Sequence, residues 1–255
     1  MQIKANFLGT GTSQGVPVIG CTCMVCESKN PKDQRLRSSL FISINNCNIL
    51  IDIGPDFRSQ ILKLNKFSID SILFTHQHRD HTAGLDDLRP IYYMYKKPIA
   101  LYAENNVFKA IKNDFNYLFY GANYPGKPKF HLNNITTDDF YISNIKIKPI
   151  RVMHHKLPVL GYRIGNLSYI TDANYISDKE KEKLMGSEIL IINSLQQEKH
   201  ISHFNLKESL SLIAEIQPKT AYLTHISHGM GLHDSIQKEL PKNVLLAYDG
   251  LAITL

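Results

Sequence analysis

Residues 75–81 read Thr-His-Gln-His-Arg-Asp-His and follow directly on the apolar run Ser71–Phe74. Three imidazoles and one carboxylate thus lie in six positions behind a predicted strand. After a strand, side chains at i and i+2 can point to one place, while the following turn can send Asp80 and His81 to a second place beside it. This spacing suits two metal ions that activate a water and stabilise both oxygens of an in-line displacement. A surface histidine cluster is the alternative, and the apolar strand in front of the turn argues against it.

Short apolar runs alternate with helical patterns along the whole chain. Runs rich in β-branched and aromatic residues, bounded by Gly, Asn or Pro, predict strands at Ile3–Leu8, Ser39–Ile44, Asn48–Ile53, Ser71–Phe74, Ile99–Tyr102, Tyr141–Val152, Leu160–Ile164, Ser168–Thr171, Ile189–Asn193, Ala221–Thr224 and Val244–Ala247. Apolar residues at helical spacing predict helices at Phe57–Leu64, Asn105–Phe119, Asp178–Met185, Leu206–Ile216 and Asp234–Leu240. With no Pro/Gly/Ser linker, we expect one domain over residues 1–255, made of two similar β-rich halves with helices outside.

Polar residues interrupt the predicted strands at their ends. The positions are Asp52, the run Thr75–His81, His154, Asp172 and His225. Loops at strand ends carry functional residues on a rigid frame, and α/β folds place their sites there. We therefore expect these side chains to form one site.

Composition and charge exclude several classes of protein. With 255 residues, 43% hydrophobic and 20% charged, the chain has ordinary globular composition. The longest apolar runs, such as Ile189–Ile192, are far below the roughly 18 residues that span a bilayer, so no membrane partner is expected. The N-terminus lacks a signal-peptide apolar stretch, which predicts a cytoplasmic protein. The net charge of +6 is spread along the chain and would not repel an anionic substrate.

Three of the four cysteines, Cys21, Cys23 and Cys26, lie within six positions. In a reducing compartment they are thiolate ligands rather than disulfides, and they are one ligand short of a tetrahedral zinc site. Cys47 stands alone before an apolar run and is predicted to be buried and inert. A nucleic-acid zinc knuckle is an alternative, encouraged by basic residues nearby, but the aromatic residues that stack on bases are missing.

The polar residues at the strand ends resemble, in order and spacing, the metallo-β-lactamase superfamily. Those that carry the resemblance are Asp52, His76, His78, Asp80, His81, His154, Asp172 and His225. Within it, the sequence is most similar to the phosphoribosyl cyclic phosphate phosphodiesterases of the carbon-phosphorus lyase pathway. That similarity rests on Gly9-Thr-Gly-Thr-Ser13, Cys21-x-Cys23-x-x-Cys26, Gly161-Tyr162 and His225-x-x-His228. The resemblance implies an α/β fold, a four-layer αβ/βα sandwich.

The resemblance also implies how the ligands divide between ions. One catalytic ion would be bound by His76, His78 and His154, the other by Asp80, His81 and His225, with Asp172 bridging them. Imidazoles and a bridging carboxylate suit Zn or Mn, and a water between the ions would be held as hydroxide. Asp52 would support the histidine turn from behind the ligands. His228 would complete a structural zinc site with the three cysteines, in a zinc-binding loop at about residues 13–37.

Further histidines receive roles from the same resemblance. Together with Asp80, His203 is the predicted catalytic residue: it would face the substrate and give a proton to the leaving alkoxide or stabilise the phosphorane. The alternative is that His203 only caps a helix with Asn205. His155, next to the ligand His154, would be a neighbour or a substrate contact. The remaining histidines match no motif and are expected at the surface; they are His131, His200 and His233.

Two loops depart from the phosphoribosyl enzymes, namely residues 54–58 and 84–89. Because they flank the predicted site, the superfamily chemistry is better supported than any one substrate. Three arginines, Arg58, Arg79 and Arg89, could bind phosphate or could form structural pairs with nearby aspartates. The aspartates in question are Asp56, Asp86 and Asp87.

We therefore predict a dinuclear metal phosphodiesterase that acts on a small anionic phosphodiester, either cyclic or linear. A tRNA 3′-processing endonuclease is an alternative, but no long basic Gly/Pro-rich insertion is present to grip RNA, so nucleic acid is the less favoured partner. A non-hydrolytic metal-binding protein, like the superfamily member of pyrroloquinoline quinone biosynthesis, is another alternative, and the complete ligand set argues against it. The sequence is compatible with a homodimer.

Overall fold

The computed structural model describes residues 2–120 and 126–255 and contains two mixed β-sheets of seven strands each. The first sheet has the order β14-β1-β2-β3-β4-β5-β6 and the second the order β13-β12-β11-β10-β9-β8-β7. The strands are β1 Ile3–Gly9, β2 Ser39–Ile44, β3 Cys47–Ile51, β4 Ser71–Leu73, β5 Ile99–Ala103, β6 Phe130–Asn134, β7 Phe140–Ile142, β8 Ile145–His154, β9 Leu157–Ile164, β10 Leu167–Ile170, β11 Ile189–Asn193, β12 Thr220–Thr224, β13 Val244–Leu246 and β14 Ala252–Thr254.

Helices cover the outer face of each sheet. They are α1 Phe57–Leu64, α2 Arg79–Thr82, α3 Arg89–Tyr95, α4 Asn105–Asp114, α5 Asn116–Phe119, α6 Asp178–Glu182, α7 Leu206–Ile216 and α8 His233–Glu239, with 3₁₀ turns at Pro31–Asp33, Leu85–Leu88 and His228–Met230. In the described part of the chain, none of these helices is long and apolar enough to cross a membrane.

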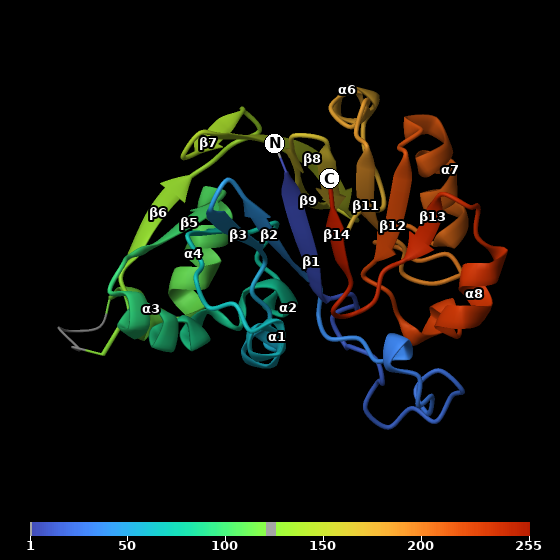
Figure 1. The fold of residues 1–255 in the computed structure, drawn as a ribbon, viewed down its shortest axis with the longest axis horizontal. Helices are drawn as coiled ribbons and strands as arrows, with labels where there is room; N and C mark the ends of the chain where they lie inside the picture. The colour runs from blue at the N-terminus through green and yellow to red at the C-terminus, as the bar shows by residue number, and fades with distance from the viewer. Residues whose placement is uncertain (1, 121–125) are drawn as a thin grey trace.

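Three apolar clusters separate the layers. One lies between the two sheets and includes Phe7, Leu40 and Tyr162. The second packs α1 and α4 on the outside of the first sheet, and the third packs α7 and α8 on the outside of the second. Figure 1 shows α7 and α8 on one side of the molecule and α1 to α4 on the other. The predicted α/β fold, a four-layer αβ/βα sandwich, is confirmed.

The predicted elements are largely present, with differences where local geometry intervenes. The predicted strand Tyr141–Val152 is wrong as one strand: it is the hairpin of β7 and β8, because Ser143 turns the chain with φ 52°. The predicted helix Asn105–Phe119 is interrupted at Phe115, which has φ −114° and separates α4 from α5. The strands β6 and β14 were not predicted, since their short, partly exposed segments lack a clear apolar alternation.

The two sheets bring the ends of their parallel strands to one edge of the sandwich. β3 to β6 are parallel in the first sheet, and β10 to β13 in the second. Three residues that follow these strands have left-handed backbones: Asp52 with φ 60°, Asp172 with φ 52° and His225 with φ 54°. Non-glycine residues rarely adopt this conformation, and such strain concentrates at functional sites. This edge is therefore the candidate site.

A buried polar cluster attaches the N-terminal loop to the second half of the chain. The Arg35 guanidinium donates to Thr10 Oγ1 at 2.8 Å and to the Ala247 carbonyl at 2.6 Å, and it faces His233 Nδ1 at 3.2 Å. The expectation that His233 lies at the surface is wrong, since only 3% of it is exposed. Because a guanidinium can only donate, His233 Nδ1 is an acceptor and the ring is neutral. Burial, reinforced by Arg35, lowers the pKa of His233 to about 4.

This pKa shift predicts an acid-labile contribution to stability. His233 has its depressed pKa only in the folded state, so its contribution is complete above about pH 6.5 and is lost as the pH falls toward 4. Relative to His233→Gln, the wild type should lose about 2 kcal/mol of unfolding free energy between about pH 7.5 and about pH 5. Urea denaturation of the two proteins at each pH measures the difference. His131→Gln, at an exposed histidine of β6, is the matched control and should show no such change; a constant difference for His233→Gln would contradict the neutral ring.

Candidate metal centre

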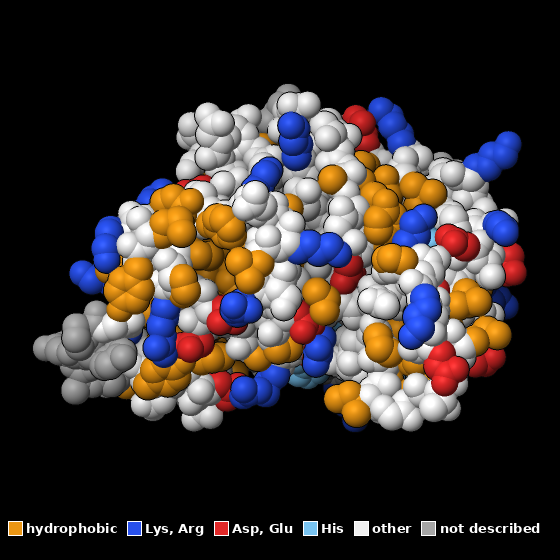
Figure 2. Space-filling view, turned by 60° about the horizontal axis from the view of Figure 1, so that its bottom comes forward, with side chains coloured by type: hydrophobic (Ala, Val, Ile, Leu, Met, Phe, Trp, Pro, Cys, Tyr) orange, Lys and Arg blue, Asp and Glu red, His pale blue; other side chains and the backbone are white. Residues whose placement is uncertain are grey.

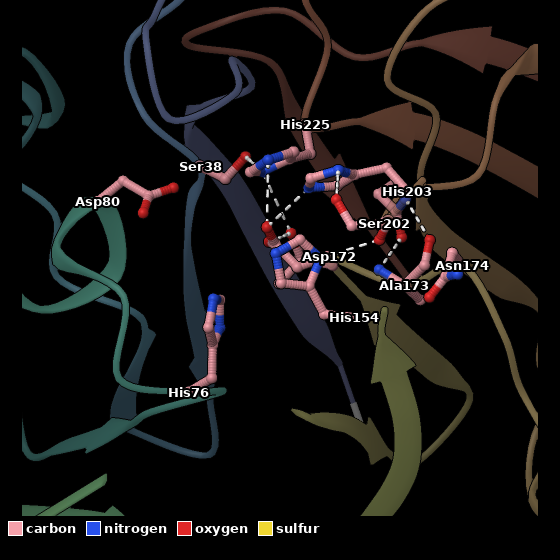
Figure 3. Close-up of polar contacts among 12 residues, drawn as sticks. Ser38, His76, Asp80, His154, Asp172, Ala173, Asn174, Ser202, His203 and His225 are labelled. Atoms are coloured by element: carbon pink, nitrogen blue, oxygen red, sulfur yellow. Dashed lines mark hydrogen bonds and ion pairs between the residues drawn. The ribbon is translucent and has the colours of Figure 1, made fainter. Parts of the chain in front are cut away.

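Four side chains from both sheets meet at the strand-end edge. The ligand atoms of Asp80, His81, Asp172 and His225 all lie within 4.8 Å of one another. His81 Nε2 is 3.0 Å from Asp80 Oδ2 and 3.2 Å from Asp172 Oδ2, and His225 Nε2 is 3.2 Å from Asp172 Oδ1. Figure 3 shows Asp172 between His225 on one side and His154 on the other, with Asp80 pointing toward them. The arrangement has the size and donors of a cation site.

A second set of donors lies beside the first and shares Asp172. The ligand atoms of His154, Asp172 and His203 also lie within 4.8 Å of one another. The rings of His76 and His78 stand next to this set: their centroids are 4.5 Å apart, and those of His78 and His154 are 5.2 Å apart. The structure thus brings all seven predicted ligands to one place, with His203 as an additional neighbour.

Hydrogen bonds behind the rings orient the imidazoles. His81 Nδ1 lies 2.7 Å from Asp52 Oδ2, and His154 Nδ1 lies 2.8 Å from the Ser202 carbonyl. In each case the acceptor holds a hydrogen on Nδ1, so Nε2 is the nitrogen that faces the centre of the site.

Hydroxyl groups do the same for the other two buried rings. Thr75 Oγ1 lies 3.0 Å from His76 Nδ1, and Ser38 Oγ lies 3.1 Å from His225 Nδ1. Ser38 and Ser202 were not identified from the sequence, because each contacts a histidine far along the chain and stands in no motif. Because Thr75 directly precedes His76, its place beside the histidine turn was the one feature of the sequence that pointed to a role for it.

Asp52 connects the histidine turn to the first sheet. Its carboxylate accepts from the Thr75 amide and hydroxyl, each at 2.8 Å, as well as from His81. The residue is fully buried, and burial raises its pKa while His81 opposes the shift. The backbone of the turn is also held closely, since a Cβ on Gly54 would lie 2.1 Å from the Asp80 carbonyl.

The chemistry of the donor set fits divalent cations. His76 Nε2 is buried without a hydrogen-bond partner, which is costly unless another group satisfies it. Burial and the neighbouring His81 lower the pKa of His76, so its ring stays neutral and can act as a ligand. Asp80, Asp172 and Asp52 instead raise the pKa of His81 despite its burial, because they concentrate negative charge around it. A cation would neutralise the same charge.

The three clustered cysteines form a separate site with His228. Their sulfur atoms lie 3.2 Å (Cys21), 3.5 Å (Cys23) and 3.5 Å (Cys26) from His228 Nδ1. The four ligand atoms are mutually within 4.8 Å, which is the donor set of a closed tetrahedral zinc site. A backbone hydrogen bond from Cys26 lowers the pKa of Cys23 to about 6, whereas burial raises the pKa of Cys26 to about 11, so Cys23 is the thiol of this pair that ionises more readily. Cys47 is apart from this group and 8% exposed.

The charged residues around the site are mostly paired. Arg89 Nη2 lies 2.6 Å from Asp86, and Arg79 Nη1 lies 3.1 Å from Asp114. Asp56 pairs with Arg37 rather than with Arg58. His155 is exposed beside His154. Figure 2 shows Lys and Arg spread among Asp and Glu on the face turned toward this edge, rather than in one basic block.

His203 does not cap the following helix. The cap of α7 is Asn205, which forms a capping box with Glu208. His203 is 8% exposed, and its Nε2 lies 3.1 Å from Asp172 Oδ1. Its ring therefore faces the donor set, next to the predicted ligands.

Known proteins resemble this chain over its whole length. A family model described as a β-lactamase superfamily domain matches residues 47–226. A solved structure of a diphosphatase from the PhnP family is 35% identical, with a TM-score of 0.94 over 100% of this chain and 98% of that one. The structure of human tRNase Z, short form, is 18% identical with a TM-score of 0.73 over 98% of both chains, and shows the fold alone.

A curated relative from Porphyromonas gingivalis, named octanoyltransferase, is 40% identical over 252 residues. The match covers 98% of this chain and 51% of that protein. The chain thus spans about half the length of the first curated relatives that it matches.

The contact between Asp52 and His81 predicts how metal binding responds to mutation. Asp52→Asn keeps the size of the side chain but weakens the acceptor behind His81, so metal affinity at the strand-end site should fall about 10- to 100-fold. Competition with a chromogenic chelator measures the affinity. Asp70→Asn, a matched change at the opposite edge where Asp70 pairs with Lys97, should leave it unaltered. Equal affinities of Asp52→Asn and wild type would refute this role.

Proposed function

The chain belongs to the metallo-β-lactamase superfamily, and from this membership we propose that it is a phosphodiesterase with a dinuclear metal centre. The observation that carries the proposal is the shared carboxylate: Asp172 lies within 4.8 Å of the ligand atoms of Asp80, His81 and His225 in one group and of those of His154 and His203 in the other. A carboxylate between two sets of imidazoles is the donor arrangement that two adjacent divalent cations require. The membership itself supports a metal-dependent hydrolase.

We assign the ligands as the resemblance to the superfamily implies. His76, His78 and His154 would hold one ion, Asp80, His81 and His225 the other, and Asp172 both. Zn or Mn suits these donors. When bound, two such ions supply an activated water as nucleophile and neutralise charge on the phosphate. Cys21, Cys23, Cys26 and His228 would hold a structural zinc that fixes the N-terminal loop.

His203 is assigned to the leaving group. Its Nε2 faces the shared carboxylate but the ring is not needed to complete either ligand set. A proton held at Nε2 can pass to the oxygen that leaves phosphorus, a role worth about 100-fold or more in rate when the leaving group is a poor one. The ring is nearly buried, so water does not compete for this proton.

A small anionic diester is the proposed substrate class. The PhnP-family structure, named a diphosphatase, is 35% identical and matches over almost its full length, which supports chemistry on a phosphorus ester. The relative named octanoyltransferase is 40% identical, but the match covers only 51% of that protein, and the cysteines of this chain do not support acyl transfer through a thiol at the strand-end site. Among the described residues, three cysteines surround His228, and Cys47 begins β3 at the end remote from Asp52. No cysteine of the chain is thus placed as a nucleophile at the strand-end site.

Hydrolysis of a diester by variants of the ligands tests the proposal. The metal-replete protein should cleave bis(p-nitrophenyl) phosphate, and Asp80→Asn should lower kcat by about three orders of magnitude because several kcal/mol of charge stabilisation are lost. Asp139→Asn, at an exposed aspartate paired with Lys146, is the control and should retain activity.

Metal content separates the proposal from its alternatives. Elemental analysis should give three ions per chain, two at the strand-end site and one at the cysteines. One ion per chain, or activity that persists in Asp80→Asn, would rule out a dinuclear phosphodiesterase. Binding of a tRNA precursor that weakens steeply with salt would instead favour the endonuclease function.

A further inference from the structure

His200 stands outside both donor sets, yet it contacts the proposed acid. It lies in the loop between β11 and α7, exposed to solvent, and its ring centroid is 5.1 Å from that of His203. The two Nδ1 atoms are 3.2 Å apart, which is hydrogen-bond distance. The expectation that His200 is a surface residue agrees with its exposure but misses this contact.

The ring of His203 is fixed on its other sides. It stacks on His225 with 5.0 Å between centroids and 14° between planes, and it meets His154 edge-on at 4.5 Å. Its Nε2 points to Asp172 Oδ1. With the plane held by packing, the chemistry of the ring depends on which nitrogen carries hydrogen.

The hydrogen-bond pattern at His200 indicates that Nδ1 of His203 carries a hydrogen. The Ser202 amide donates to His200 Nδ1 at 3.4 Å, so this atom has a lone pair. A lone pair at His200 Nδ1 requires that the hydrogen on the line between the two Nδ1 atoms belongs to His203. Ser202 Oγ lies 3.1 Å from His203 Nδ1 and 3.3 Å from His200 Nδ1, and it supports the same pair. Partial burial and the neighbouring His203 lower the pKa of His200, which keeps its ring neutral.

We propose that His200 is a positioning residue that accepts the Nδ1 hydrogen of His203 and thereby fixes Nε2 as the nitrogen that faces the leaving oxygen. The inference rests on the proposed phosphodiesterase function. In the step itself the bond from phosphorus to the leaving oxygen breaks, and its electron pair stays on that oxygen. Before the step the His203 ring carries hydrogen on both nitrogens. The Nε2–H bond breaks as the new O–H bond forms, and His203 is left neutral with its remaining hydrogen on Nδ1 toward His200.

Leaving groups of different basicity test this role. A sugar alkoxide, as in a 2′,3′-cyclic nucleotide, needs a proton to leave, whereas p-nitrophenolate does not. His200→Ala should lower kcat for the cyclic nucleotide about tenfold with unchanged KM, and should change bis(p-nitrophenyl) phosphate hydrolysis by less than about twofold. His200→Asn should restore most of the loss, because the amide oxygen can accept at the place of Nδ1. His131→Ala is the matched control at an exposed histidine.

A spectroscopic measurement tests the hydrogen position without turnover. In metal-replete protein with ¹⁵N-labelled histidine, long-range ¹H–¹⁵N spectra should show His203 protonated at Nδ1. That signal should disappear or exchange rapidly in His200→Ala, return in His200→Asn and persist in His131→Ala. Metal content measured on each sample shows that the ligand sets are intact.

The two measurements separate failure of this inference from failure of the function. If wild-type protein cleaves neither ester, the phosphodiesterase function fails, and the spectra still decide whether His200 holds the Nδ1 hydrogen. If wild type is active but His200→Ala slows both esters equally, or leaves the His203 spectrum unchanged, the positioning role is overturned. Selective loss on the cyclic nucleotide together with the altered spectrum supports it.

Discussion

The candidate site depends on hydrogen bonds made at its back, at Nδ1 of four of its imidazoles. A histidine offers two nitrogens, and a partner at one of them fixes both the ring orientation and the nitrogen that is left for a ligand. Here the partners are chemically varied: a carboxylate for His81, a carbonyl for His154 and hydroxyls for His76 and His225. Because these partners come from separate loops, the donor set forms only when both sheets are packed.

The sheets also hold the chain in conformations that it would otherwise avoid. Asp52, Asp172 and His225 each have a left-handed backbone, and each such residue costs about 1–3 kcal/mol. All three are at most 2% exposed, and they follow, within two residues, strands that are paired with a neighbour on both sides. The strain therefore persists because the neighbouring core and hydrogen bonds determine the backbone there, and it turns the side chains out of the strand direction toward a common point.

The local sequence pattern predicted most strands and helices and identified the polar residues at the strand ends. It failed for residues whose position depends on contacts with distant parts of the chain. The strand ends are visible in sequence because an apolar run stops at His or Asp within one or two positions. His233 could not be placed, since its burial depends on Arg35, almost two hundred residues earlier. Likewise Ser38 and Ser202 are ordinary loop residues until folding sets them behind His225 and His154. The β7–β8 turn was missed because Ser143 and Asn144 barely interrupt a long apolar alternation.

Asp172 couples metal binding to the packing of the two sheets. It follows β10 of the second sheet, yet Oδ2 lies 3.2 Å from His81, which belongs to the turn after β4 of the first. Asp52, Asp80 and Asp172 concentrate negative charge around one buried ring, and this charge raises the pKa of His81 despite its burial. Divalent cations would balance this charge from between the sheets, where their ligands come from both. Since unfolding would separate those ligands, bound cations must stabilise the packed arrangement of the two sheets as well as the site.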